Sequence, residues 1–401
     1  MTFNFRSIPI GELCQGIYDG PHATPAPSDS GAIFLGISNF VNGKLNLSPS
    51  NIRYISEEDY PKWTKRVTPK AHDIVFSYEA TLNLYAIIPD GFRGCLGRRM
   101  ALMRPDEGVV DYRFLYYYMF SPAWREEVER YKVNGSTVDR IPLVSFPSFR
   151  VDLPNMRTQK AIADILFAID QKIDSNSRVN DNLEQQAELL YHERFETIDR
   201  DKLPVGWRIV RLGDVATISK KSFNPAKEPE MLLEHYSIPA FDEAHFPVFE
   251  PSTAIKSNKF IVDDSCFMIS KLNPTTKRVW KPYCLTENAV CSTEFIVYKA
   301  KSQEITDFLY SVIDSASFSD FMCSHVTGST GSRQRTTPSD TLAFERVLPN
   351  AEEIAEYQGI VSPMLEQIKC NTIENDRLKR LRDSLLPKLM SGEIDVSDIQ
   401  L

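Results

Sequence analysis

The chain has 401 residues, 42% hydrophobic and 25% charged, so it can bury two or three ordinary cores and shows no bias toward disorder or fibre formation. Its formal net charge of -8 disfavours a protein that binds DNA unaided, because neutralising phosphates requires clustered Lys and Arg. No apolar run reaches the roughly 18 residues of a membrane span, and the first residues do not resemble a signal peptide, so we expect a cytoplasmic protein with no membrane contact.

The cysteines are scattered, and none forms a CxxC pair or has a nearby His at metal-ligand spacing. We therefore expect reduced, mostly buried thiols and no metal site. The seven are Cys14, Cys95, Cys266, Cys284, Cys291, Cys323 and Cys370.

The first 150 residues predict an α+β domain made of short strands, turns and two helices. Turn-rich stretches such as GPHATPAPSDSG separate the apolar runs. We expect strands at 33–35, 52–55, 73–78, 85–88 and 100–103, followed by helices at 112–120 and 124–131. The aromatic residues of 114–120 are more typical of a helix core than of a platform for stacking bases.

A long amphipathic helix is predicted for 157–195, because apolar residues recur there every three or four positions. After it, 203–346 resemble the first domain. They contain an opening strand and turn at 203–218, strands at 266–270 and 295–299, and a helix at 305–315. A second amphipathic helix is expected from 357 to 389, with Pro363 bending or delaying its start.

The chain also repeats itself at an offset of about 195 residues. FRVDLPN at 149–155 precedes the first long helix, and FERVLPN at 344–350 precedes the second. Two copies of a domain plus helix imply a pseudo-twofold axis. Such a molecule suits a ligand with two spaced half-sites, and duplex DNA is the obvious candidate.

The two helices most economically bury their apolar faces against each other as an antiparallel coiled coil. Asn176 and Asn180, matched by Asn371 and Asn375, would lie on this seam and fix its register. A loosely packed, wet stretch explains these residues equally well. A helix of roughly 35 residues is about 50 Å long, which corresponds to about 15 base pairs of DNA.

Two Gly-Ser-Thr segments, each followed by arginine, suit recognition of the DNA backbone, because small residues allow close approach while hydroxyls and amides bind phosphate oxygens. Arg333 and Arg335 could instead bind guanine O6 and N7. The alternative is a solvated turn before the last strand of each domain. The residues are Gly135, Ser136, Thr137, Arg140, Gly328, Ser329, Thr330, Arg333 and Arg335.

Further candidate DNA contacts lie in predicted loops. Lys271, Lys277 and Arg278 follow a predicted strand, where an ordinary exposed loop is equally plausible. In the first domain, Tyr78, Arg93 and Arg98 are weaker candidates.

Catalytic motifs are missing from the sequence. The nearest match to an adenine-methyltransferase loop, at 273–276, has neither the second Pro nor the aromatic residue that stacks on a flipped base. The Gly-Ser-Thr segments contain no Walker A lysine, and no paired-acid nuclease cluster is evident. We therefore expect a chain that binds and does not catalyse.

Several segments resemble the specificity subunit of type I restriction-modification enzymes. LPNMRTQKAIADILFAIDQKIDSN (153–176) is similar to the start of that family's central helix, and RLKRLRDSLLPKLMSGEIDV (377–396) to its distal end. LPVGWRIVRLGDVATI (203–218) is similar to the usual opening of the second recognition domain, and the Gly-Ser-Thr segments resemble those that close each domain. The departures are LPN in place of a Pro-rich run, and AEEIAEYQ where Glu-Gln-Lys is commoner.

This resemblance implies two target-recognition domains, 1–150 and 201–346, with helical spacers at 151–200 and 347–401. Each domain would recognise half of a bipartite, asymmetric DNA site. The helices would dock two methyltransferase subunits, and motor and nuclease restriction subunits would join the complex. S-adenosylmethionine, ATP and Mg would bind to those partners, so we expect no cofactor on this chain.

Two other interpretations remain open. The chain could serve a different restriction-modification assembly, or it could be a coiled-coil scaffold whose globular ends bind protein.

Overall fold

The helical runs expected from the sequence form α4 (Met156–Tyr191) and α10 (Ala351–Met390). The computed structural model describes residues 5–135, 138–328 and 334–396. It divides into unit 1, Met1–Gln171 with Leu378–Leu401, and unit 2, Lys172–Arg377. Each unit therefore contains part of both long helices, together with its own sheets and short helices.

Both long helices start with the same asparagine cap. The side-chain oxygen of Asn155 accepts a hydrogen bond from the amide of Thr158 at 3.0 Å, and that of Asn350 accepts one from the amide of Glu353 at 2.9 Å. These bonds satisfy amides that have no partner within the helix.

The expected start of the second helix at residue 357 was wrong, since α10 begins at Ala351 and Pro363 lies inside it. The Asn350 cap and the buried side chains of Ile354 and Tyr357 stabilise the first turns, which outweighs the local effect of the proline. At the other end of the first helix, α4 stops at Tyr191 and a π-helical segment, His192–Glu196, follows it.

Unit 1 is built on a four-stranded antiparallel sheet with the strand order β2-β10-β7-β8. A smaller sheet has the order β6-β3-β9, and two further strand pairs are β1-β11 and β4-β5. The strands are β1 (Arg6–Pro9), β2 (Cys14–Asp19), β3 (Ala32–Phe34), β4 (Phe40–Val41), β5 (Lys44–Leu45), β6 (Tyr54–Ile55), β7 (Ile74–Ser77), β8 (Tyr85–Ile87), β9 (Gly94–Cys95), β10 (Met100–Pro105) and β11 (Arg150–Leu153). The strands expected from the sequence are confirmed, with shifts of a few residues at their ends.

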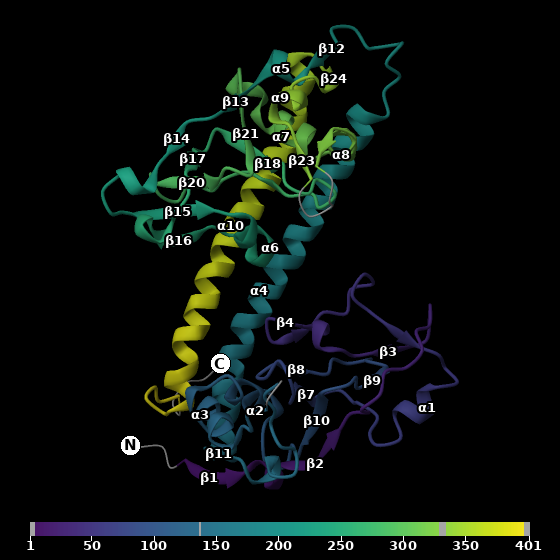
Figure 1. Cartoon of the computed structure of the whole chain (residues 1–401), viewed down its shortest axis with the longest axis vertical. Coiled ribbons are helices and arrows are strands. Elements are labelled where there is room, and N and C mark those ends of the chain that lie inside the picture. The colour runs from purple at the N-terminus through teal and green to yellow at the C-terminus, as the bar shows by residue number, and fades with distance from the viewer. Residues whose placement is uncertain (1–4, 136–137, 329–333, 397–401) are drawn as a thin grey trace. The chain divides into compact units, whose positions relative to one another are not determined.

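The core of unit 1 joins this sheet to helices. The helices are α1 (Tyr60–Trp63), α2 (Tyr112–Tyr118) and α3 (Pro122–Tyr131). The aromatic residues of α2 are buried with Trp124 of α3 and with Leu166 of α4, which confirms their expected place in a helix core. Figure 1 shows α2 and α3 beside the first part of α4, where the Tyr117 hydroxyl donates to Asp170 at 2.6 Å.

Unit 2 is built on a second four-stranded antiparallel sheet with the order β13-β21-β18-β19. It also has a five-stranded sheet, β14-β17-β20-β15-β16, that was not expected from the sequence, and the pairs β12-β24 and β22-β23. The strands are β12 (Arg208–Arg211), β13 (Ala216–Ser219), β14 (Ser222–Phe223), β15 (Leu232–Tyr236), β16 (Val248–Pro251), β17 (Lys259–Ile261), β18 (Cys266–Ser270), β19 (Val279–Trp280), β20 (Ala289–Ser292), β21 (Phe295–Ala300), β22 (Val326–Thr327), β23 (Arg335–Thr336) and β24 (Glu345–Leu348).

Short helices complete unit 2. They are α5 (Leu212–Val215), α6 (Ile238–Ala244), α7 (Thr306–Asp314), α8 (Ala316–Ser324) and α9 (Pro338–Thr341). Both units also contain single 3-10 turns, at Ile10–Leu13, Ile37–Asn39, Phe146–Ser148, Pro225–Lys227, Ser252–Ala254 and Gln303–Ile305.

The two units share one topology, as the sequence repeat predicts. Strands β2, β10, β7 and β8 correspond in order and direction to β13, β21, β18 and β19, and the pair β1-β11 corresponds to β12-β24. In each unit two helices follow the sheet, α2 and α3 or α7 and α8. The inner strands β7 and β18 occupy the same position in their sheets.

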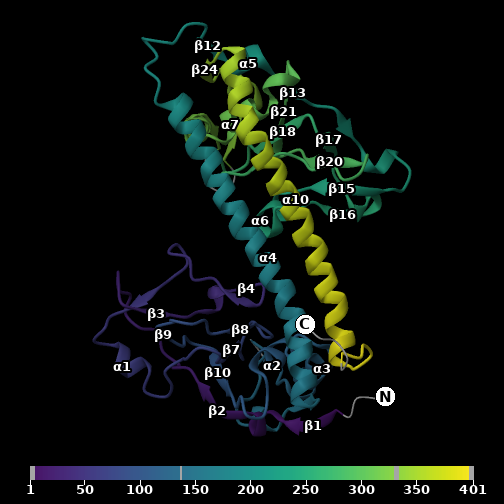
Figure 2. The same ribbon diagram turned by 180° about the vertical axis from the view of Figure 1, so that it is seen from behind.

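Within unit 2, α4 and α10 lie side by side (Figure 1 and Figure 2). Tyr191 of α4 contacts Tyr357 of α10, and Asn176 contacts Asn375, so residue numbers rise along one helix as they fall along the other. The two helices are therefore antiparallel in this unit.

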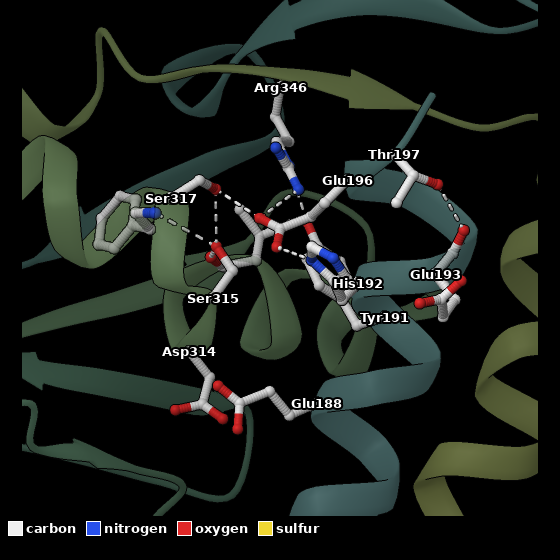
Figure 3. A network of polar contacts seen from close by, with 12 residues as sticks. Glu188, Tyr191, His192, Glu193, Glu196, Thr197, Asp314, Ser315, Ser317 and Arg346 are labelled. Carbon is white, nitrogen blue, oxygen red and sulfur yellow. Dashed lines mark hydrogen bonds and ion pairs between the residues drawn. The ribbon is translucent and has the colours of Figure 1, made fainter. Parts of the chain in front are cut away.

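A polar network fixes the π-helical segment to the rest of unit 2 (Figure 3). The Glu196 carboxylate accepts hydrogen bonds from the Ser317 hydroxyl at 2.6 Å and from the guanidinium of Arg346 on β24 at 2.7 Å, and it pairs with His192 at 3.0 Å. Arg346 also donates to the Tyr191 hydroxyl at 2.8 Å. Although burial opposes ionisation, bonds from Ser317, His192 and Arg346 hold the pKa of Glu196 below its ordinary value.

All seven cysteines are free thiols. Within the described ranges, no helix is long and apolar enough to cross a membrane.

Candidate nucleic-acid interface

Three segments of unit 1 meet at one end of the central strands through backbone hydrogen bonds. They are the hairpin loop 78–84 between β7 and β8, the turn at 98–99 before β10, and the segment 139–141 that follows the first Gly-Ser-Thr. The Tyr78 amide donates to the carbonyl of Arg99 at 3.1 Å, and the Tyr78 carbonyl accepts from Ile141 at 2.7 Å. The Ala80 amide donates to Asp139 at 3.0 Å. We call these three segments junction 1.

Junction 2 is the matching arrangement in unit 2. It consists of the hairpin loop 271–278 between β18 and β19, the turn at 293–294 before β21, and the segment 334–336 that follows the second Gly-Ser-Thr. The Lys271 amide donates to the carbonyl of Glu294 at 2.9 Å, and the Lys271 carbonyl accepts from Thr336 at 3.1 Å. The Asn273 amide donates to Gln334 at 2.9 Å.

These bonds establish which residues are equivalent in the two junctions. Tyr78 corresponds to Lys271, Ala80 to Asn273, Arg99 to Glu294 and Arg140 to Arg335. Ala80 and Asn273 both have left-handed backbone, at φ 69 and 49 degrees, a conformation that costs an alanine about 1–2 kcal/mol. The same unusual backbone at the same position supports the match.

This match corrects one expectation from the sequence. Arg140 and Arg333 each lie three residues after a Gly-Ser-Thr segment, so the sequence alone matches them with each other. The β-bridges instead pair Arg140 with Glu79 and Arg335 with Leu272 at equivalent places. Arg335 is therefore the counterpart of Arg140, and the second segment is two residues longer. Arg333 lies outside the described residues.

In junction 1, Arg98 and Arg140 are exposed. Tyr78 is only 6% exposed, and its hydroxyl is buried without a hydrogen-bond partner among the described residues. Burial and the nearby Asp19 carboxylate raise the pKa of Tyr78, so the phenol stays neutral. A DNA contact by Tyr78 stays a prediction, and it would require this ring to move.

The backbone explains why glycine is the first residue of both Gly-Ser-Thr segments. A Cβ at Gly135 would lie 2.2 Å from the backbone oxygen of Val138, and Gly328 has φ 116 degrees, which favours glycine. The neighbouring Ser136, Thr137, Ser329 and Thr330 lie outside the described residues, so their phosphate contacts stay predictions.

In junction 2, Lys271 is half-buried, and Arg335 is held by Glu294. The guanidinium donates from Nε to one Glu294 oxygen at 2.9 Å and from Nη2 to the other at 3.2 Å. The structure thus brings Lys271 and Arg335, two of the candidates from the sequence, into one site.

The side chains of three other candidates pair with acids outside the junctions. Arg93 pairs with Glu57 and lies 4.5 Å from the centre of the Tyr60 ring. Lys277 pairs with Asp314 of α7 at 3.1 Å, and Arg278 pairs with Asp242 of α6 at 2.6 Å. A DNA contact by any of these three stays a prediction, because each is held by an acid that lies outside both junctions.

Sequence reasoning missed Glu79, Arg99 and Glu294 as parts of this site. Glu79 and Arg99 form an ion pair of 3.1 Å in junction 1. The available signal was the internal repeat: once β7 is matched with β18, and β10 with β21, the residues that flank these strands fall into equivalent places.

The four seam asparagines form two hydrogen-bonded pairs in unit 2. Asn176 donates to Asn375 at 3.0 Å, and Asn371 donates to Asn180 at 2.8 Å. The sequence repeat matches Asn176 with Asn371 and Asn180 with Asn375, so it makes these two bonds equivalent. Three of the four side chains are buried, at 4% for Asn176, 6% for Asn371 and 8% for Asn375.

No group of three or more His, Cys, Asp or Glu side chains is placed to hold a metal ion in the part of the chain that the structure describes.

The chain has relatives among known proteins. Residues 24–185 match the family described as the type I restriction modification DNA specificity domain. The MjaIX specificity subunit of a type I restriction enzyme, from Methanocaldococcus jannaschii, is 24% identical over 383 residues, covering 89% of this chain and 83% of the relative. The HindI specificity subunit of Haemophilus influenzae is 23% identical over 445 residues, covering 90% and 94%.

The fold is likewise similar to a solved structure. The crystal structure of the type I restriction-modification system S subunit from M. genitalium superimposes with a TM-score of 0.61 over 96% of each chain, at 15% identity. The family match over residues 24–185 and the two relatives support one conclusion: along about nine-tenths of its length the chain is similar to specificity subunits of type I restriction enzymes.

Proposed function

We propose that the chain recognises a bipartite, asymmetric DNA sequence, with junction 1 contacting one half-site and junction 2 the other. The observation that carries the proposal is the repetition of one backbone arrangement, bearing basic side chains, at equivalent places in both units. Base contacts would supply sequence preference, and phosphate contacts would set the position of the protein on the duplex.

The two half-sites would differ because the two junctions carry different side chains. Tyr78, Arg99 and Arg140 in junction 1 are replaced by Lys271, Glu294 and Arg335 in junction 2. A pseudo-twofold protein with unlike junctions would therefore select two unlike base sequences at a fixed spacing.

We further propose that α4 and α10 form an antiparallel coiled coil that serves as a spacer and as the docking surface for two methyltransferase subunits. Helices of 36 and 40 residues are about 54 and 60 Å long at 1.5 Å per residue. The exchange of the two asparagine bonds under the repeat supports a pseudo-twofold axis through this helix pair.

In this proposal the chain binds without catalysing. S-adenosylmethionine, ATP and Mg would bind to methyltransferase and restriction subunits, and the complex would act on DNA in the cytoplasm. The chain's net charge of -8 is consistent with partners that complete the positive surface around the duplex.

Selection from random duplex DNA tests the function. The full chain, alone and with its methyltransferase subunit, is incubated with the pool, and the bound DNA is sequenced. We expect two short motifs separated by a fixed gap. No enrichment in either preparation would contradict the proposal and favour a protein-binding scaffold.

A further inference from the structure

The acidic residue lies at a different position in each junction and pairs with a different arginine. In junction 1, Glu79 of the hairpin loop pairs with Arg99 of the turn at 3.1 Å. In junction 2 the acid lies in the turn, and Glu294 pairs with Arg335 of the third segment. Because the turn residue is basic in one junction and acidic in the other, a different cation is held in each.

The geometry of the Glu294–Arg335 pair restrains the orientation of the guanidinium plane. Two bonds, of 2.9 and 3.2 Å, join the two carboxylate oxygens to Nε and Nη2. A forked pair of this kind fixes a plane, whereas a single bond leaves the group free to rotate about it. Arg335 thus presents its guanidinium in a defined orientation.

Glu294 is itself held in place by the turn. Its carbonyl accepts from the Lys271 amide at 2.9 Å, and its amide donates to the Ser292 hydroxyl at 3.2 Å. The side chains of Arg335 and Glu294 remain 44% and 28% exposed, so the pair lies at the surface where DNA can reach it.

An oriented arginine suits a base rather than a phosphate. Bidentate recognition of guanine O6 and N7 depends on the direction of the guanidinium plane, while a phosphate accepts bonds from many directions. In junction 1 the residue equivalent to Glu294 is Arg99, a cation that cannot orient Arg140 in this way.

We propose that Glu294 is a positioning residue, which orients Arg335 for recognition of a guanine in the second half-site. Arg140, which no equivalent acid orients, contacts the phosphate backbone of the first half-site. This inference rests on the proposed function and adds to it the base that one junction prefers and the residue that sets the preference.

The test compares the motifs selected from random duplexes by the full chain with its methyltransferase subunit, as wild type and as two variants. Glu294→Gln keeps the size of the side chain but removes the charge, and Arg335→Lys keeps the charge but removes the fork. We expect each variant to lose about tenfold or more of the preference for one G·C pair in the second motif, in line with the discrimination of a bidentate contact. Affinity for unrelated DNA should stay within about twofold, because few phosphate contacts are lost.

Glu79→Gln is the matched control, since it removes the equivalent carboxylate charge from junction 1. It should leave the second motif unchanged. Thermal unfolding of every variant establishes that the chain is folded, and Arg335→Lys tests the inference even if Glu294→Gln does not fold.

The inference would be overturned if folded Glu294→Gln kept the G·C preference of the wild type in the second motif. It would also be overturned if this variant weakened both motifs equally. Loss in Glu294→Gln without loss in Arg335→Lys would also overturn it, because Glu294 would then contact a base itself. If the wild type selects no bipartite motif, the proposed function fails together with this inference; a wild-type motif that the variants retain overturns the inference alone.

Discussion

At the residue scale, ion pairs decide where the basic side chains of the candidate loops are held. The sequence identifies Lys271, Lys277 and Arg278 as one basic loop, yet only Lys271 lies where the three segments of junction 2 meet. Lys277 and Arg278 instead pair with Asp314 and Asp242. These acids are distant in the sequence, so a local count of charges could not predict that two of the three cations would be engaged within the protein.

The Glu196 network gives unit 2 a dependence on pH. Folding lowers the pKa of Glu196 below its ordinary value near 4.5. The carboxylate therefore adds stability above pH 4.5, and this contribution is lost as the pH falls through its lower folded value. Glu196→Gln should lower the free energy of unfolding by about 1–3 kcal/mol at pH 7, and by less near pH 4.

Urea unfolding at both pH values measures this difference. Glu193→Gln is the control, because Glu193 lies on the same π-helical segment but is exposed. A deficit in Glu196→Gln that is as large at pH 4 as at pH 7 would contradict the assignment of the pH dependence to this carboxylate.

At the scale of the elements, periodicity in the sequence predicted both long helices and most strands of the two central sheets. It predicted too late a start for α10. Pro363 indicated a delayed helix, whereas the Asn350 cap and the buried Tyr357 stabilise the first turns. It also missed the five-stranded sheet of unit 2. Strands such as β14, with two residues, are too short to show alternation, and their pairing is with distant segments.

The asparagine pairs test whether buried amides hold the helix pair together in unit 2. Asn176→Leu leaves the amide of Asn375 without this partner, which should destabilise the chain by about 1–3 kcal/mol. Changing both Asn176 and Asn375 to leucine should cost less than the sum of the single changes, with a coupling of about 1 kcal/mol.

Chemical unfolding of the two single variants and the double variant gives this coupling. Asn182→Leu, at an exposed position of α4, should change the stability by no more than about 0.5 kcal/mol. Strictly additive costs for Asn176→Leu and Asn375→Leu would show that the observed hydrogen bond contributes nothing to the pairing of the helices.

At the scale of the whole molecule, the internal repeat was the main basis for predicting the domain architecture. It gave two domains of one topology, and both units contain the same four-stranded sheet and the same cap before the following helix. The repeat located the candidate site only approximately. Insertions such as the two extra residues before Arg335 shift the sequence register, whereas the backbone hydrogen bonds of the junctions restore it.

The most direct test that each junction contacts one half-site is to alter the two junctions separately. The motif selected by the wild-type chain with its methyltransferase subunit is compared with those selected after Arg99→Ala and Arg140→Ala together, and after Lys271→Ala and Arg335→Ala together. We predict that the first pair of substitutions weakens or erases one half of the motif and spares the other, and that the second pair does the reverse. Loss of the same half in both variants, or equal weakening of both halves, would contradict the assignment of one junction to each half-site.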